Sequence, residues 1–423
     1  MRCTAIVSIL VIALGQAGFA QNLSVTSSMA PPARPGNTGV ADVRGVTPVA
    51  SSTGFSKWLA GFRKRALAQG IKSAVYDRAM RGVRYNADIV AKDRNQSEFT
   101  KQIWDYLDTA VSAARVSNGR AALSKHATTL RKIEAKYGVE KEVIAAIWGL
   151  ESAYGTFRGN ISTIEALASL AYDPRRSAFF EQQLIDALKI LQSGDTTVAS
   201  LTGSWAGAMG HTQFMPSSYL EHAQDFARDG RRDIWGDDPT DALASAAAYL
   251  ASNGWTKGQP WGVEVRLPRG FDYAITSERF KKPTREWVRM GVRSVNGRPL
   301  PNYRNSSILL PAGHTGPAFL IFSNFQVIET YNTADAYVIG VGQLANRLGG
   351  GAPIKGTWPR NDRALSFGEK QEMQRRLLAR GFDPQGVDGI IGPRTIAAVQ
   401  AFQKSINMVP DGYVSIGILN RLR

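Results

Sequence analysis

The chain has 423 residues, 43% of them hydrophobic and 20% charged, and it carries a net charge of +16. A chain of this length is long enough for two or three domains with full cores, and its composition is that of a soluble globular protein. The positive charge indicates an acidic or polyanionic partner, such as nucleic acid, an anionic membrane or a bacterial wall polymer. Cys3 is the only cysteine, which excludes an internal disulfide.

The first 20 residues predict a secretory signal peptide. Arg2 precedes an apolar run over 5–14, and small residues end at Ala20, before Gln21. The run is shorter than the roughly 20 residues of a membrane span, and no later stretch is long and apolar enough. No cysteine follows the cleavage site, so a lipoprotein anchor is not predicted. We expect a periplasmic protein with no integral membrane segment and no nucleic acid partner.

Residues 21–52 are rich in Pro, Gly, Ser, Thr and Ala without periodicity, which predicts a disordered linker. Helical spacing of apolar residues dominates the part that follows. Ser162 opens a capping box, Asp173 precedes a proline and Ser217 is a third predicted N-cap. The predicted helices cover 55–69, 96–115, 121–137, 141–154, 162–171, 173–193, 217–226, 241–253 and 319–348.

The region 261–311 has a different pattern. Short runs such as 263–267 alternate between apolar and polar residues and predict a small β-rich insertion. Residues 349–363 then form a predicted linker, and 364–423 a small helical module. We therefore expect a mainly α protein in which 53–348 is one domain that contains the insertion.

The sequence excludes several kinds of catalytic site. The four histidines are scattered, without an HExxH motif or a paired spacing, so a zinc hydrolase is not predicted. The chain has no GxSxG motif, no P-loop and no dinucleotide fingerprint. Cleavage of the signal peptide would remove the only thiol, which excludes a cysteine nucleophile. A Ser/His/Asp triad stays open on residue counts alone.

Glu151 carries the strongest catalytic signal. It lies near the end of an apolar helix, four residues after Ile147 and seven after Ile144, so burial should raise its pKa. A carboxyl group that stays protonated near neutral pH can act as a general acid. The structural alternative is a glutamate that caps or pairs at a helix end.

The nearest other acids in the chain, Glu165 and Asp173, both have predicted roles at helix starts. Two-carboxylate glycosidases need a second acid roughly 5–10 Å from the first. The sequence therefore favours a site with one carboxylate, in which the substrate supplies its own nucleophile. Because folding brings distant acids together, the two-acid alternative stays open.

Three ordered motifs carry a family resemblance: IWGLESAYG at 147–155, GSWAGAMGHTQFMPSSY at 203–219, and Tyr331 with its neighbour Asn332. They closely resemble the lytic murein transglycosylase B family, over about 55–348. The resemblance implies a goose-lysozyme-like helical domain that cleaves peptidoglycan glycan strands. It matches Glu151 to the family's single catalytic acid, which protonates the oxygen between MurNAc and GlcNAc. The carboxylate then takes the proton of the MurNAc C6 hydroxyl, which closes a 1,6-anhydro ring without water.

The same resemblance implies the substrate-binding residues. Ser204 and Gln213 match hydrogen-bonding positions, and Met209 matches an apolar wall, where core packing is the structural alternative. Gly203, with two further glycines of the motif, lets the backbone approach the sugar closely. Four tyrosines match the lining of the groove, where aromatic faces suit sugar C–H surfaces. The full set is Tyr106, Ser204, Met209, Gln213, Phe214, Tyr249, Tyr331, Asn332 and Tyr337.

No cofactor is required by this interpretation. Some members of the family carry a calcium-binding loop after the second motif, and Asp225 and Asp229 offer carboxylates at that place. Ala227 and Gly236 stand where oxygen ligands are expected. Calcium is therefore an alternative to a plain acidic turn.

The motifs VDGIIGPRT at 387–395 and AVQAFQ at 398–403 resemble the three-helix peptidoglycan-binding domain, over about 365–422. A second binding site on the same polymer raises the local concentration of the enzyme. The predicted core of this module is Leu377, Leu378, Phe382, Ile396, Val399, Phe402, Ile418 and Leu422.

We expect a monomer that acts on peptidoglycan glycan strands, with other cell-wall enzymes as further candidate partners. Two alternatives stay open. One is a hydrolytic muramidase that uses water. The other is a non-catalytic wall-binding protein, against which the intact Glu151 argues.

Overall fold

The computed structural model describes residues 52–94, 102–278 and 280–423. The predicted signal peptide, 1–20, lies outside the described residues. So does the predicted linker 21–52, except Ser52, which begins a helix. No helix in the described part of the chain is long and apolar enough to cross a membrane.

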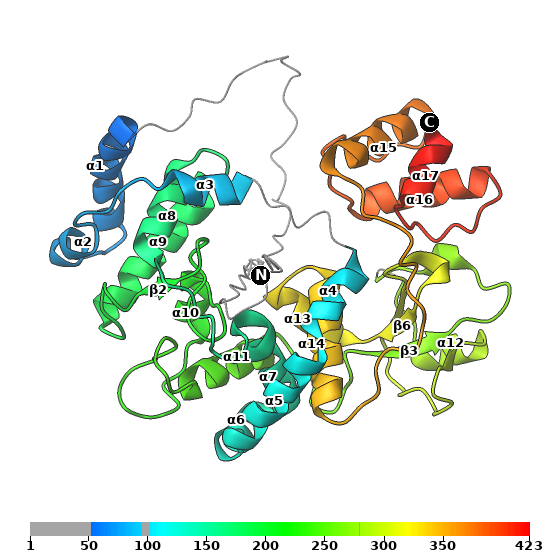
Figure 1. Ribbon diagram of the computed structural model, residues 1–423, viewed down its shortest axis with the longest axis horizontal. Coiled ribbons are helices and arrows are strands. Elements are labelled where there is room, and N and C mark those ends of the chain that lie inside the picture. The colour runs from blue at the N-terminus through cyan, green and yellow to red at the C-terminus, as the bar shows by residue number, and fades with distance from the viewer. Residues whose placement is uncertain (1–51, 95–101, 279) are drawn as a thin grey trace. The chain divides into compact units, whose positions relative to one another are not determined.

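The described residues divide into two compact units, each built from two stretches of the chain. The first contains 52–94 and 147–249, and the second contains 102–146 and the described residues from 250 onward. The boundaries fall within α7 (Lys141–Ser152) and α11 (Thr240–Ser252), which Figure 1 labels.

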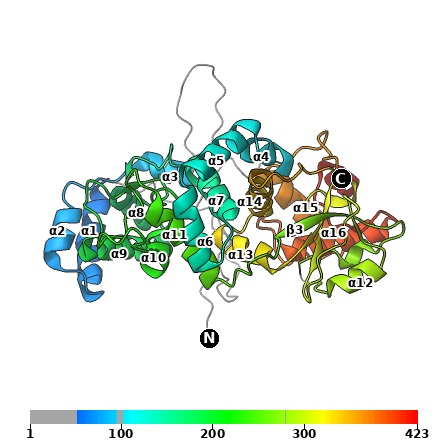
Figure 2. The same cartoon turned by 90° about the horizontal axis from the view of Figure 1, so that it is seen from below.

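The first unit is built around two helices that lie side by side, α8 (Thr163–Tyr172) and α9 (Ser177–Ser193) (Figure 1 and Figure 2). Leu167 of α8 and Leu188 of α9 are fully buried, as the apolar spacing of both helices predicts. The elements of the unit besides α7 and α11 are α1 (Ser52–Ala68), α2 (Ser73–Ala79), α3 (Ala87–Arg94), β1 (Ile161–Ser162), α8 (Thr163–Tyr172), α9 (Ser177–Ser193), β2 (Thr202–Gly203) and α10 (Pro216–His222).

Of the three predicted N-caps in this unit, one is confirmed and two are wrong. The hydroxyl of Ser162 accepts the backbone N–H of Glu165 at 3.3 Å and begins α8. Asp173 does not begin α9; it ends α8, and its carboxylate pairs with Arg94, 79 positions earlier. Ser217 lies inside α10, which begins at Pro216 and ends four residues before the predicted end. An ion partner so distant in sequence cannot be seen in a local capping pattern.

The second unit places helices around α14. The predicted helix 96–115 is interrupted, because Ser112 accepts the backbone N–H of Arg115 and begins a new helix. α14 contacts α4, α5 and α13, and its residues Val338, Val341 and Leu344 are fully buried. These helices are α4 (Ile103–Ala110), α5 (Ala113–Lys125), α6 (Ala127–Tyr137), α13 (Ser323–Tyr331) and α14 (Asp335–Leu348).

The predicted β-rich insertion is a four-stranded antiparallel sheet in the order β4-β3-β6-β5. Its strands are β3 (Gly262–Arg266), β4 (Arg293–Ser294), β5 (Ser307–Leu309) and β6 (Ala318–Ile321), and α12 (Thr284–Arg289) accompanies them. β6 extends the sheet beyond the predicted limit of 311, and the helix predicted from 319 begins only at Ser323. All four residues of β6 are buried. A short, wholly apolar run does not distinguish a central strand from a buried helix.

The C-terminal module consists of α15 (Phe367–Ala379), α16 (Pro393–Ser405) and α17 (Ile416–Leu422). Ser366 and Glu369 form a complete capping box at the start of α15. Its core contains Leu377, Val399, Phe402, Ile418 and Leu422, as predicted. The prediction that Leu378 belongs to the core is wrong, because Leu378 is 50% exposed.

The segment between α14 and α15 is tied to the rest of the second unit. The carboxylate of Glu264 in β3 accepts the backbone N–H groups of Lys355 and Gly356 at 2.8 and 2.5 Å. Arg360 pairs with Asp108 of α4 through two hydrogen bonds of 2.7 and 2.8 Å. Although 349–363 has the composition of a linker, its backbone and side chains are therefore anchored.

Candidate active site

Glu151 lies in the last turn of α7, and its side chain is only 1% exposed. Ile144, Ile147 and Leu150 on the same helix are fully buried, so the apolar stripe predicts its burial correctly. The helix ends at Ser152, two residues earlier than predicted, because Ala153 and Tyr154 adopt positive φ angles of 48° and 60°. A carboxyl group in this setting is shielded from bulk water.

The loop 203–216 folds back on itself through short antiparallel bridges. Met209 pairs with both Gly203 and Phe214, and its backbone exchanges two hydrogen bonds of 2.9 and 3.0 Å with Phe214. A Cβ at Gly203 would lie 2.1 Å from the carbonyl oxygen of Ala208. The close approach predicted for this glycine is therefore made to the protein's own backbone.

Ser204 and Gln213 both hold this loop together. The hydroxyl of Ser204 accepts the backbone N–H groups of Ala206 and Ala208 at 3.3 and 3.0 Å. The side-chain amide of Gln213 donates to the carbonyl oxygens of Arg158 and Gly210 at 3.1 and 2.7 Å. Both side chains are at most 2% exposed. In the structure, both side chains therefore stabilise the backbone of the loop 203–216.

His211, which the sequence analysis set aside as a scattered histidine, connects this loop to α7. Its Nδ1 lies 3.1 Å from Nε1 of Trp148, and its Nε2 lies 2.7 Å from the carbonyl oxygen of Gly236. Its own carbonyl oxygen accepts the hydroxyl of Ser152 at 2.5 Å. Burial lowers the pKa of His211 to about 4, so its imidazole is neutral. No spacing rule singles out such a residue, because its partners lie 63 and 25 positions away.

Tyr249 of α11 belongs to the first unit and is 1% exposed. Its ring centroid lies 5.9 Å from that of Phe214 and 4.8 Å from that of His222. Burial also lowers the pKa of His222. The structure thus brings Ser204, Met209, Gln213, Phe214 and Tyr249 into the same unit as Glu151.

The other predicted site residues belong to the second unit. The rings of Tyr331 and Tyr337 stack at 6.4 Å with an angle of 12°, and both are at most 1% exposed. Asn332 joins α13 to α14 by accepting the backbone N–H of Ala334 at 3.0 Å. Among the described residues its buried Nδ2 has no hydrogen-bond partner, so it can still donate to a ligand. Tyr106 is half-buried on α4.

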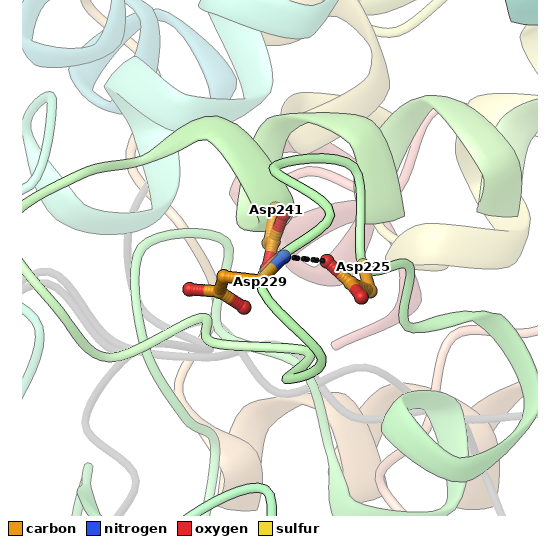
Figure 3. Close-up of side chains that lie close together, drawn as sticks. All are labelled: Asp225, Asp229 and Asp241. Atoms are coloured by element: carbon orange, nitrogen blue, oxygen red, sulfur yellow. Dashed lines mark hydrogen bonds between the residues drawn. The ribbon is translucent and has the colours of Figure 1, made fainter.

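The acidic loop after α10 brings together the carboxylates of Asp225, Asp229 and Asp241, with oxygens within 4.8 Å of one another (Figure 3). Asp225 accepts the backbone N–H groups of Asp229 and Gly230 at 3.1 and 3.0 Å. Asp241 accepts three more, from residues 226, 227 and 233. The carboxylates therefore act as acceptors that close the loop on itself.

A second cluster, which the sequence analysis missed, joins Glu278, Glu329 and Asp335 within 4.8 Å in the second unit. Burial and the neighbouring carboxylates raise the pKa of Glu329 to about 8 and that of Asp335 to about 7. The cluster lines a pocket of about 770 Å³ together with residues of the C-terminal module. Its members lie 51 and 6 positions apart in the chain, so only the fold could reveal it.

Comparison with known proteins gives two family matches. The family described as transglycosylase SLT domain matches residues 54–346, which is more than half of the chain. The family described as peptidoglycan binding domain matches residues 369–422.

Individual relatives agree with these matches. The membrane-bound lytic murein transglycosylase B of Escherichia coli K12 is 32% identical over 252 residues, which are 57% of this chain and 66% of that protein. The SltB3 of Pseudomonas aeruginosa, solved in complex with NAG-anhNAM-pentapeptide, is 49% identical with a TM-score of 0.85. The match covers 87% of this chain and 99% of SltB3. Escherichia coli Slt35 in complex with calcium is 27% identical with a TM-score of 0.61, covering 69% and 92% of the two chains.

The chain therefore belongs to the transglycosylase SLT family, as a homologue of lytic murein transglycosylase B that carries a peptidoglycan-binding domain at its C-terminal end.

Proposed function

We propose that this protein cleaves the MurNAc-GlcNAc β-1,4 bond of peptidoglycan glycan strands as a lytic transglycosylase, with Glu151 as its acid and base. The observation that carries the proposal is the burial of the Glu151 carboxyl group, which is 1% exposed at the end of an apolar helix. A buried carboxyl group favours its protonated form, which a general acid needs.

In the first step the Glu151 carboxyl proton moves to the glycosidic oxygen while the bond from MurNAc C1 to that oxygen breaks. The GlcNAc side leaves with a free hydroxyl. In the second step the MurNAc C6 hydroxyl oxygen bonds to C1, and the Glu151 carboxylate takes the hydroxyl proton. The acid is thereby regenerated and no water is consumed. The nucleophile belongs to the substrate itself, so holding the sugar correctly replaces a second catalytic acid.

Substrate contacts are proposed at Tyr106, Ser204, Met209, Gln213, Phe214, Tyr249, Tyr331, Asn332 and Tyr337. Asn332 has the clearest support, because its buried Nδ2 keeps a donor for a sugar oxygen. Ser204 and Gln213 support the site indirectly, since their polar atoms bind the loop backbone. We further propose that 53–348 is the catalytic domain and 364–423 the wall-binding module.

Mass spectrometry of digested peptidoglycan tests the reaction, because the anhydro product is one water lighter than the product of hydrolysis. We expect anhydro-ended muropeptides from the wild type and none from Glu151→Gln. If only reducing ends formed, the protein would be a muramidase that uses water. If Glu151→Gln digested peptidoglycan as fast as the wild type, the assignment of the acid would be wrong.

Export to the periplasm and action as a monomer are also proposed. The sequence of residues 1–20 supports export, and N-terminal sequencing of the protein from a periplasmic fraction should begin at Gln21. We propose that the reaction needs no metal, because backbone N–H groups already bind the carboxylates of the acidic loop. Because Slt35 was solved in complex with calcium, the activity of this protein should be compared with calcium and with EDTA.

A further inference from the structure

His211 joins its own loop to two other segments of the first unit, α7 and the acidic loop. Nδ1 meets the indole N–H of Trp148, Nε2 meets the carbonyl oxygen of Gly236, and the carbonyl oxygen of His211 accepts the hydroxyl of Ser152. The side chain is 3% exposed. Because the backbone N–H of His211 also donates to the carbonyl oxygen of Ile234 at 3.0 Å, this one residue is bonded twice to α7 and twice to the acidic loop.

The partners of the ring determine which nitrogen carries the proton. The indole N–H of Trp148 is only a donor, so Nδ1 must be the acceptor. The carbonyl oxygen of Gly236 is only an acceptor, so Nε2 must carry the hydrogen. Arg158 lies 3.2 Å from Nε2 and donates to the same carbonyl oxygen at 2.7 Å.

A second proton on the ring would be opposed from two sides. It would set an N–H at Nδ1 against the N–H of Trp148, and it would add a charge beside the guanidinium of Arg158. Asp233 and Asp237 are the acidic groups that face the ring, and Asp237 is already paired with Arg158 at 2.8 Å. The geometry thus requires a neutral imidazole with its hydrogen on Nε2.

The two bonds to α7 lie on both sides of Glu151. Trp148 precedes Glu151 by three residues and is its neighbour on the helix surface, and Ser152 follows it directly. The hydroxyl of Ser152 also accepts the backbone N–H of Gly155 at 3.0 Å, and a Cβ on Gly155 would lie 2.5 Å from the ring of His211. The end of α7 and the turn after it are therefore packed directly on this ring.

We propose that His211 is a positioning residue for Glu151: its neutral Nε2–H imidazole holds Trp148 and its backbone carbonyl oxygen holds Ser152, which together fix the last turn of α7. This inference rests on the proposed function, in which Glu151 is the acid. His211 itself transfers no proton. Its contribution is to keep the carboxyl group in one orientation toward the glycosidic oxygen.

Two substitutions each keep one of the two hydrogen bonds of the imidazole, to Trp148 or to Gly236. In His211→Asn the amide oxygen can replace Nδ1 as acceptor for Trp148. In His211→Gln the amide nitrogen can replace Nε2 as donor to Gly236. His211→Phe removes both. Tyr76→Phe is the control, because it removes one partly buried hydrogen bond, from the Tyr76 hydroxyl to the carbonyl oxygen of Leu59 at 3.0 Å, elsewhere in the same unit.

The measurements are kcat and KM on isolated glycan strands, at a temperature where circular dichroism shows each variant folded. We expect His211→Phe to lower kcat by about tenfold or more, with KM changed by less than about twofold, since small misplacements of a catalytic group are costly. His211→Asn should keep a larger share of the wild-type kcat than His211→Gln, because it retains an acceptor for the indole N–H of Trp148 on α7. Tyr76→Phe should keep the wild-type kcat. In ¹⁵N NMR spectra, His211 of the wild type should show the Nε2–H tautomer at neutral pH.

Full kcat in folded His211→Phe, or an Nδ1–H tautomer, would overturn the positioning role. If His211→Asn and His211→Gln lost equal shares of kcat, in proportion to their loss of melting temperature, His211 would have only a structural role and the proposed positioning role would be overturned as well. These outcomes are distinct from failure of the proposed function, which would appear as undiminished activity in Glu151→Gln.

Discussion

His314 and Asp411 join the insertion of the second unit to the C-terminal module. Nδ1 of His314 lies 2.5 Å from a carboxylate oxygen of Asp411, and the backbone N–H of His314 donates to the same oxygen at 2.9 Å. The other oxygen of Asp411 accepts the side-chain amide of Gln403 inside the module at 2.7 Å. One carboxylate therefore serves both the fold of the module and its attachment.

This attachment predicts that the module does not swing freely. His314→Ala combined with Arg360→Ala removes two side-chain contacts to the rest of the second unit, the His314–Asp411 contact and the Arg360–Asp108 ion pair. Limited proteolysis within 349–366 should then become about two- to tenfold faster, with the module still folded. Arg423→Ala, which breaks an exposed ion pair inside the module, is the control. Equally fast cleavage of the wild type would mean that the segment is already free.

Replacing Glu151, the proposed acid, should affect the rate of cleavage far more than the binding of peptidoglycan. Glu151→Gln keeps the shape of the side chain but cannot donate a carboxyl proton, so kcat should fall by about 10²- to 10⁴-fold. Binding of insoluble peptidoglycan should stay within about twofold, because the C-terminal module is unchanged. Sedimentation with peptidoglycan and a turbidity assay measure the two quantities. Glu165→Gln, on α8, is a control expected to keep its rate.

The buried His211 should make stability depend on pH. Because burial lowers its pKa to about 4, the unfolded chain binds a proton between about pH 4 and pH 6.5 that the folded protein does not. The free energy of unfolding should therefore rise with pH across this window, by up to roughly 3 kcal/mol, and then level off. Urea titrations of the wild type and His211→Phe measure this as a difference between the two proteins. The same pH slope in both would contradict it.

The carboxylate cluster of Glu278, Glu329 and Asp335 should make the free energy of unfolding fall, not rise, as the pH increases. Burial and the neighbouring carboxylates raise the pKa of Glu329 to about 8, so between about pH 4.5 and pH 8 the folded protein binds a proton that the unfolded chain has lost. Stability is therefore lost as the pH rises through this window. Glu329→Gln should melt at a higher temperature than the wild type near pH 8 and at nearly the same temperature near pH 4.5. A lower melting temperature of the variant near pH 8 would show that the cluster stabilises the fold when charged.

Removal of calcium should change neither the melting temperature nor the reaction rate of the wild type. A cation at about 100 times its dissociation constant would stabilise the fold by about 2.7 kcal/mol, which a melting curve detects easily. We expect the same melting temperature and rate with calcium and with EDTA. Asp225→Ala should lower the melting temperature in both conditions, because it leaves the N–H groups of Asp229 and Gly230 without their acceptor. A calcium-dependent shift in the wild type that disappears in Asp225→Ala would instead identify a metal site.

The sequence by itself determined the features that depend on short spacings. The apolar period of α7 predicts the burial of Glu151, and the pair Ser162 with Glu165 predicts the start of α8. The ordered motifs were sufficient for the family, because long runs of residue types in fixed order rarely recur by chance. These signals operate within one or two helical turns, where the chain itself sets the distance between residues.

Only the tertiary structure decided which distant groups meet. Asp173 ends one helix and pairs with Arg94 instead of beginning the next helix, and 318–321 pairs as a strand with two neighbouring strands. The tautomer of His211 and the anchoring of His314 to Asp411 likewise depend on partners 63 and 97 positions away. Hydrogen bonds and ion pairs act over about 3 Å in space whatever the separation in sequence, and no local pattern records which pairs the fold will bring that close.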